Sequence, residues 1–262
     1  MSDGEVRMTR KGAVATIVFD RPAARNAMTW RMYDQLAEAC ARIRGDRKLR
    51  VAVLRGAGGK AFVSGADISK FESERATKEA VASYNLAVEK SYSGVHEFPK
   101  PTIAMIRGYC IGGGVGLAAS CDLRICSENA RFAVPAAKLG LGYDFPGLKR
   151  LVDVVGPSFA KEIFFTARQF DANEAKDMGF VNRVVPDAEH ESYVKNYADT
   201  IAANAPLTVN SVKYIVGEVM KDESARDRTR CSKLVAQCFA SRDYVEGRTA
   251  FMEKRKPVFT GS

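Results

Sequence analysis

The order of secondary structure along the chain constrains its fold most strongly. Apolar, β-branched runs that predict strands alternate with runs that predict helices up to about residue 186, and nearly all of the remainder is predicted helix. Strands are expected at residues 12–20, 49–56, 61–68, 102–107, 122–126, 130–134 and 179–185. This order indicates an α/β core at 1–188 followed by a helical C-terminal region at 189–262. No low-complexity linker separates the two parts, so we expect them to pack together.

One predicted helix shows its buried face clearly. Residues 30–44 follow a capping Thr29 and carry apolar side chains at helical spacing, which predicts a core-facing stripe of Met32, Leu36, Ala39 and Ile43. Residues 73–97 form a longer amphipathic segment that stops before Pro99, and a short helix is expected to end near residue 119. Further helices are predicted at 146–154, 157–166, 172–178, 189–204, 206–220, 222–238 and 242–254.

Composition excludes several classes of protein. The 262 residues are 46% hydrophobic and 27% charged, which is ordinary for a globular chain and unlike a disordered one. No apolar stretch is long enough for a membrane span, and the N-terminus lacks a signal-peptide core, so we expect a cytoplasmic protein without a membrane partner. Six cysteines without a CxxC pair predict buried free thiols, and two isolated histidines give no reason to expect a metal site.

The net charge of +9 constrains the partner. Basic residues are spread along the chain among acidic ones, and no nucleic-acid-binding motif is present. A small polyanionic ligand therefore fits the charge better than a nucleic acid does.

Two glycine-containing loops are the most informative segments. Gly112, Gly113 and Gly114 lie between a predicted strand and a predicted helix, where glycine lets backbone N–H groups approach a ligand or simply allows a tight turn. The spacing is not that of a dinucleotide-binding GxGxxG motif. The loop at 64–67 also follows a strand. Two such loops could each supply one N–H donor to an oxyanion hole that stabilises a thioester enolate.

Five segments resemble the enoyl-CoA hydratase/isomerase, or crotonase, superfamily, and together they span nearly the whole chain in the family's order. They are NAM at 26–28, AFVSGADI at 61–68, KPTIAMIRGYCIGGGVGLAASCDLRI at 100–125, FTARQFDANEAKDMGFVNRVV at 165–185 and AFMEKRKPVF at 250–259. The resemblance implies a spiral of ββα units with a helical trimerisation region, and a homotrimer or a dimer of trimers. It also implies an acyl-CoA thioester as substrate, with coenzyme A part of that substrate and no separate cofactor.

The resemblance also assigns site residues. The oxyanion donors would be the N–H groups of Ala66, which follows the glycine of SGAD, and Gly113, the middle glycine. Arg25 matches a position where some members place an arginine against CoA phosphates; the alternative is a solvated loop arginine. Lys254 or Lys256 would reach the CoA of a neighbouring subunit. The other matched substrate-binding positions are Ala24, Ala61, Phe62, Ser64, Asp67, Ile68, Tyr109, Gly112, Gly114, Pro135 and Ala136.

The chain departs from the family pattern at the two hydratase glutamates. Gly116 stands where hydratases carry the first glutamate, and Ala136 stands where they carry the second. Hydration needs one group to activate water and another to protonate the α-carbon, so two-glutamate hydratase chemistry is not expected here.

Asp144 is the acid that remains in the matching region. Some family isomerases carry their general base at this position, and a dehalogenase carries its nucleophile there; the neighbouring Tyr143 resembles a tyrosine of family decarboxylases. The leading hypothesis is double-bond isomerisation with Asp144 as sole acid/base. The alternative role for Asp144 is a helix N-cap before Pro146.

The sequence permits two other functions. One is a decarboxylase, a dehalogenase or another lyase or hydrolase acting on a CoA thioester. The other is a family member that binds CoA or RNA without catalysis, suggested by the pI of about 9.3 and the missing glutamates.

Overall fold

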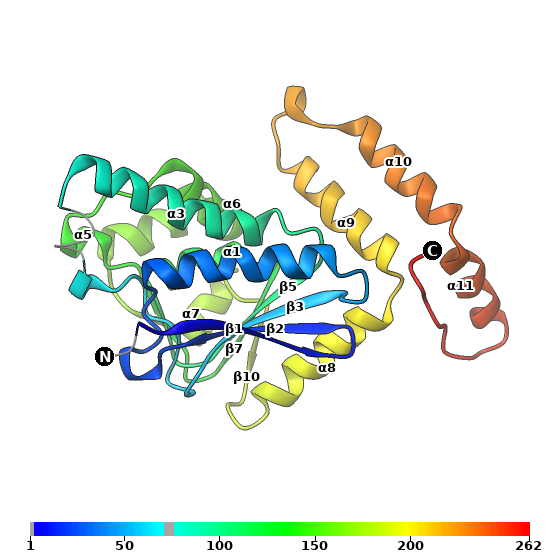
Figure 1. The fold of residues 1–262 in the computed structure, drawn as a ribbon, viewed down its shortest axis with the longest axis horizontal. Helices are drawn as coiled ribbons and strands as arrows, with labels where there is room; N and C mark the ends of the chain where they lie inside the picture. Colours follow the sequence, from blue (N-terminus) through cyan, green and yellow to red (C-terminus); the bar gives the residue numbers. More distant parts are fainter. Residues whose placement is uncertain (1–2, 71–75) are drawn as a thin grey trace.

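Two β-sheets form the centre of the molecule (Figure 1). The computed structural model describes residues 3–70 and 76–262. The larger sheet has the order β1 (Glu5–Lys11), β2 (Val14–Asp20), β3 (Val51–Gly56), β5 (Thr102–Ile106), β7 (Leu123–Ser127) and β10 (Arg183–Val185). The smaller sheet has the order β4 (Ala61–Val63), β6 (Tyr109–Ile111), β8 (Arg131–Ala133) and β9 (Phe170–Asp171). The pairs β1–β2 and β8–β9 are antiparallel, and the other neighbours are parallel.

The chain alternates between the two sheets as a spiral. The consecutive pairs β3/β4, β5/β6 and β7/β8 each give one strand to the larger sheet and one to the smaller. Helix α3 (Lys78–His96) follows the first pair, α4 (Gly113–Ala119) follows the second, and α5 (Ala136–Leu139) and α6 (Phe145–Thr166) follow the third. This repeating ββα order confirms the predicted α/β spiral.

The larger sheet is buried on both faces, as its alternating side chains show. In β3, Val51 and Val53 face the cluster that includes Val194 and Ala198 of α8 (His190–Ala203), whereas Ala52 and Leu54 face the main core. Helix α1 (Trp30–Gly45) packs on the main-core side, and its predicted stripe of Met32, Leu36, Ala39 and Ile43 is fully buried. Helix α7 (Ala172–Asp177) closes the same core beside β9.

The structure differs from the sequence prediction in its short elements. Strands β1, β6 and β9 and helix α5 were not predicted, because three of them have four residues or fewer and β1 is a largely exposed edge strand. The two helices predicted at 146–154 and 157–166 form α6, interrupted at Gly156 by a positive φ of 74°. Residues 71–75, next to and within the predicted helix at 73–97, lie outside the described chain.

Three C-terminal helices extend away from the sheets. Helices α9 (Pro206–Val219), α10 (Arg228–Phe239) and α11 (Arg242–Met252) lie to the right of the core in Figure 1, drawn in yellow to red. Helix α8 precedes them but packs on the larger sheet. The boundary between 188 and 189 stays a prediction. No helix of the described chain combines the length and apolar character needed to cross a bilayer.

Candidate active site

A cavity of about 240 Å³ lies where the loop after β4, the start of α4, one face of α3 and the α5–α6 segment meet. It brings together nine of the residues that the sequence singled out: Ser64, Ala66, Ile68, Gly112, Gly113, Pro135, Ala136, Tyr143 and Asp144. The two glycine-containing loops and the retained acid therefore share one cavity.

The two loops touch each other through their backbones. A β-carbon added to Gly65 would lie 3.7 Å from the Gly113 nitrogen, and one added to Gly113 would lie 3.9 Å from the Ala66 nitrogen. Within residues 3–70 and 76–262, neither of these two N–H groups donates a hydrogen bond to the protein. Both amides are therefore free to bind a ligand atom in the cavity.

Two glycines permit this close approach. Gly112 has φ 55° and ψ −116°, a conformation that side chains with a β-carbon rarely adopt. A β-carbon on Gly114 would lie 2.1 Å from the Val63 carbonyl oxygen, so only glycine lets α4 start against β4. The glycine run is thus required by packing as well as by access to the ligand.

The loop that carries Ala66 is pinned on both sides. The Met28 N–H donates to the Gly65 carbonyl at 2.8 Å, and the Asp67 N–H donates to the Met28 carbonyl at 2.9 Å. The Asp67 carboxylate lies 2.7 Å from the Arg21 guanidinium, and both side chains are almost fully buried. Asp67 therefore supports the loop rather than lining the cavity.

Hydrogen bonding sets the charge state of Asp67. Burial by itself raises the pKa of this carboxyl, but hydrogen bonds from Ser69 and Arg21 outweigh burial and lower its pKa below the ordinary value. Asp67 is thus held as a carboxylate beside Arg21.

Asp144 lies at the N-terminus of α6 but does not cap it. Its residue occupies the N-cap position, yet its side chain accepts no capping hydrogen bond, and it is exposed at the cavity. The neighbouring Tyr143 packs edge-on against Phe164, with ring centroids 4.8 Å apart. The carboxylate of Asp144 is consequently available for a role other than helix capping.

Helix α3 adds residues that the sequence analysis missed. Asn85, Val88, Glu89 and Tyr92 line the cavity, and their spacing places them on one face of the helix. This 3–4 spacing was visible in the sequence, but nothing there showed which face of the segment 73–97 meets the cavity. Tyr33 of α1 and Tyr84 of α3 complete a group of phenols, with their hydroxyl oxygens 3.3 Å apart.

Glu89 is a second carboxylate in the cavity. Its two oxygens accept hydrogen bonds from Arg150 of α6 at 2.9 and 2.5 Å, and Arg150 is 7% exposed. This paired arrangement distinguishes Glu89 from Asp144.

The remaining predicted site residues do not line this cavity. Ala61, Phe62 and Gly114 are buried in the core beneath it. Ala24 borders a separate hollow near the N-terminus. The guanidinium of Arg25 lies 4.9 Å from the centroid of the Tyr109 ring, outside the cavity. Figure 1 shows the segment after α11, which carries the exposed Lys254 and Lys256, at the opposite end of the molecule from α5.

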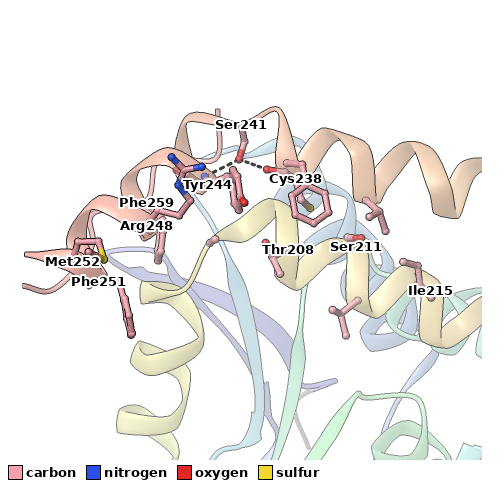
Figure 2. Close-up of a pocket in the computed structure, with 16 residues that line it drawn as sticks. Thr208, Ser211, Ile215, Cys238, Ser241, Tyr244, Arg248, Phe251, Met252 and Phe259 are labelled. Carbon is pink, nitrogen blue, oxygen red and sulfur yellow. Dashed lines mark hydrogen bonds between the residues drawn. The ribbon is translucent and has the colours of Figure 1, made fainter. Parts of the chain in front are cut away.

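A larger hollow lies on the C-terminal helices, away from these groups. It has a volume of about 840 Å³ and is lined mainly by apolar side chains of α9, α10 and α11, including Ile215, Phe239 and Phe251 (Figure 2). Two of its polar side chains are hydrogen-bonded to the protein: the Ser241 hydroxyl donates to the Cys238 carbonyl and accepts from the Tyr244 N–H, and the Asp243 carboxylate accepts from the Thr260 and Gly261 N–H groups. In the described part of the chain, no cluster of three His, Cys, Asp or Glu side chains could hold a metal ion.

The sequence of this chain is similar to those of known enoyl-CoA hydratase/isomerase family proteins. The profile of the enoyl-CoA hydratase/isomerase family matches residues 9–262. A short-chain-enoyl-CoA hydratase of Clostridium acetobutylicum is 35% identical over 256 residues, covering 98% of this chain and 97% of that protein. A carnitinyl-CoA dehydratase of Escherichia coli K12 is also 35% identical, over 260 residues and 98% of each chain.

Solved structures of this family have the same fold as this chain. The crystal structure of an enoyl-CoA hydratase/carnithine racemase from Magnetospirillum magneticum superimposes with a TM-score of 0.92 and 38% identity, over 98% of this chain and 96% of that one. An enoyl-CoA hydratase/isomerase family protein from Hyphomonas neptunium gives a TM-score of 0.91 and 33% identity, over 98% of both chains. The chain therefore belongs to the enoyl-CoA hydratase/isomerase, or crotonase, family of enzymes.

Proposed function

We propose that this enzyme moves the double bond of an enoyl-CoA thioester between the 3- and 2-positions, with Asp144 as its acid/base. The observation that carries the proposal is the shared cavity: it joins the Ala66 and Gly113 amides with Asp144, while positions 116 and 136 hold glycine and alanine. Relatives named for hydrating or dehydrating CoA esters support a CoA thioester as the substrate class.

The proposed reaction needs only one carboxylate. Asp144 takes a proton from the α-carbon of a 3-enoyl thioester, and the electron pair of that C–H bond delocalises onto the thioester oxygen. The Ala66 and Gly113 N–H groups hydrogen-bond this oxygen as its negative charge develops. Asp144 then returns the proton to the γ-carbon, which gives the 2-enoyl thioester with no net gain or loss of atoms.

Glu89 is the rival carboxylate, and its surroundings argue against it. Both of its oxygens are hydrogen-bonded by Arg150, so its lone pairs already have protein partners. Among residues 3–70 and 76–262, the side chain of Asp144 at the α6 N-terminus accepts no capping hydrogen bond. We therefore assign proton transfer to Asp144 and a supporting role in the cavity wall to Glu89.

Isosteric variants of acidic residues test this assignment. Asp144→Asn should lower kcat for isomerisation by ~10²–10⁴, the usual contribution of one general base. It should leave the melting temperature unchanged, because the Asp144 side chain makes no capping bond. Asp153→Asn is the matched control, since Asp153 lies on the same helix and pairs only with Lys149 on the surface.

Two results would contradict the assignment of Asp144 as the base. If Asp144→Asn keeps full isomerase activity while Glu89→Gln loses it, the base has been assigned to the wrong carboxylate. If neither variant changes the rate, the isomerase proposal fails. Intact mass after incubation with a halobenzoyl-CoA would then test the nucleophilic alternative, in which the Asp144 carboxylate attacks the aryl carbon, expels halide and is left as an aryl ester.

We also infer that the protein works as a homotrimer or a dimer of trimers. The apolar hollow on α9–α11 lies beside exposed side chains such as Val216, which is 56% exposed, and Phe251, which is 82% exposed. Exposed apolar surface of this extent is typical of a protein–protein interface. In such an assembly Lys256 could approach the CoA of a neighbouring subunit, while Arg25 over Tyr109 offers a cation to the phosphates from the same subunit.

A further inference from the structure

Tyr92 of α3 occupies the space beside the position of the first missing glutamate. A β-carbon added to Gly116 would lie 3.3 Å from Cε2 and 3.7 Å from Cδ2 of the Tyr92 ring. A contact of 3.3 Å is closer than ordinary van der Waals packing, so the ring would have to shift by a few tenths of an ångström to admit a β-carbon at position 116. Tyr92 is 4% exposed, and its ring packs near Tyr33, with centroids 6.1 Å apart.

The hydroxyl of the same residue holds the oxyanion loop. Tyr92 donates a hydrogen bond of 2.8 Å to the carbonyl oxygen of Gly113. Burial raises the pKa of the Tyr92 phenol, and the neighbouring Tyr84 raises it further, so the hydroxyl keeps its proton and remains a donor. The bond fixes the residue whose N–H points into the cavity.

We propose that Tyr92 is a positioning residue that replaces the missing side chain at position 116, because its ring fills that space and its hydroxyl anchors Gly113 in the oxyanion hole. This inference deepens the proposed function, since it rests on Gly113 as an oxyanion donor. Its consequence is a restriction on chemistry. While Tyr92 is present, a carboxylate side chain at position 116 is disfavoured because the ring must first shift, so the enzyme is suited to reactions that need none there.

A double-mutant cycle in thermal stability tests the steric part without using activity. Gly116→Glu alone should lower the melting temperature by about 5 °C, because the new side chain collides with the ring. Combined with Tyr92→Ala, it should cost clearly less than the sum of the two single variants, because the space is then open. Gly94→Glu in α3 is the control, since a β-carbon there meets nothing within 4 Å; its effect on the melting temperature, of either sign, should simply add to that of Tyr92→Ala.

A spectroscopic titration tests the positioning part. A 3-ketoacyl-CoA forms an enolate that absorbs in the near ultraviolet, and an oxyanion hole favours that enolate. Tyr92→Phe keeps the ring but removes the donor, so the equilibrium constant for enolate formation on the enzyme should fall about 10-fold. Affinity for coenzyme A alone should be unchanged, which a merely structural defect would not achieve.

The outcomes separate this inference from the proposed function. Additive costs for Gly116→Glu and Tyr92→Ala would overturn the steric role, and an unchanged enolate equilibrium in Tyr92→Phe would overturn the anchoring role. If the wild-type enzyme binds the 3-ketoacyl-CoA without favouring its enolate, the oxyanion hole itself is wrong, and with it the anchoring role. In that case the stability cycle still decides whether Tyr92 occupies the place of a side chain at 116.

Discussion

The cavity at the start of α4 and the hollow on the C-terminal helices differ in both size and chemistry. The C-terminal hollow is larger, about 840 Å³ against about 240 Å³, but its lining is mainly apolar. The smaller cavity gathers two unused amides, phenols and two carboxylates, positioned by β4, α3, α4 and α6. A reaction needs several polar groups held close together, and the smaller cavity provides them. The larger apolar surface is better suited to binding another protein chain.

Charges placed on the apolar surface of α9–α11 test whether this surface is a subunit interface. Val216→Asp combined with Phe251→Asp places two charges on the apolar face of α9 and α11, where both native side chains are mostly exposed. The proposed homotrimer or dimer of trimers should dissociate into monomers, because burying unpaired carboxylates between subunits is unfavourable. Light scattering coupled to gel filtration measures the change in mass.

A charge on an exposed phenylalanine outside the C-terminal helices provides the matched control. Phe165 of α6 is 75% exposed, comparable to Phe251, but lies away from the C-terminal helices. Phe165→Asp should keep the assembly intact. If the wild-type protein is already a monomer at micromolar concentration, the oligomer proposal and the expected role of Lys256 both fail.

A smaller effect concerns the loop that holds Ala66. Asp67→Asn removes the Asp67 carboxylate from the buried Arg21 guanidinium, which should lower the free energy of unfolding by about 2 kcal/mol at neutral pH. Because hydrogen bonding lowers the pKa of Asp67 in the folded state, this stabilisation is present above the unfolded-state pKa and is lost as pH falls through the folded-state pKa.

The pH dependence gives a direct measurement for Asp67. Denaturation by urea from pH 7 down to pH 3 should show a constant difference between wild type and Asp67→Asn until about pH 5, and a shrinking difference below it. A difference that grows toward low pH would contradict the assigned ion pair.

The smallest effect is expected at the rim of the site. Arg25→Ala should raise KM for an acyl-CoA about 3-fold and leave kcat and the melting temperature unchanged, because Arg25 is exposed and its guanidinium lies over the Tyr109 ring at the surface. An equal KM for wild type and variant would show that Arg25 is a solvated loop residue. Steady-state kinetics with one enoyl-CoA suffice for this comparison.

Most of the fold followed from local pattern. Strands such as β3 and β5 are continuous apolar runs, as expected of parallel strands buried on both faces, and the α1 stripe had helical spacing. The two loops of the site could be found because their glycines meet strict backbone demands. Short elements such as β9 carry too few residues for a pattern to emerge, since their strand pairing is fixed by distant parts of the chain.

The wall of the cavity could not be predicted in the same way. Tyr92 and Glu89 lie on an amphipathic helix whose polar and apolar residues give no sign of which face meets the oxyanion loop. The Glu89–Arg150 pair joins residues 61 positions apart, so it depends on how α3 and α6 pack. Tyr92 and Gly116 likewise become partners only in the folded chain.

In the proposed mechanism, the Asp144 carboxylate and the Ala66 and Gly113 amides suffice for a double-bond shift and do not suffice for hydration. The direct test is to supply wild-type enzyme separately with a 3-enoyl-CoA and with a 2-enoyl-CoA in ¹⁸O-labelled water, and to identify the products by mass. We expect rapid interconversion of the two enoyl thioesters with almost no label incorporated. Labelled 3-hydroxyacyl-CoA forming faster than the isomer would contradict the account.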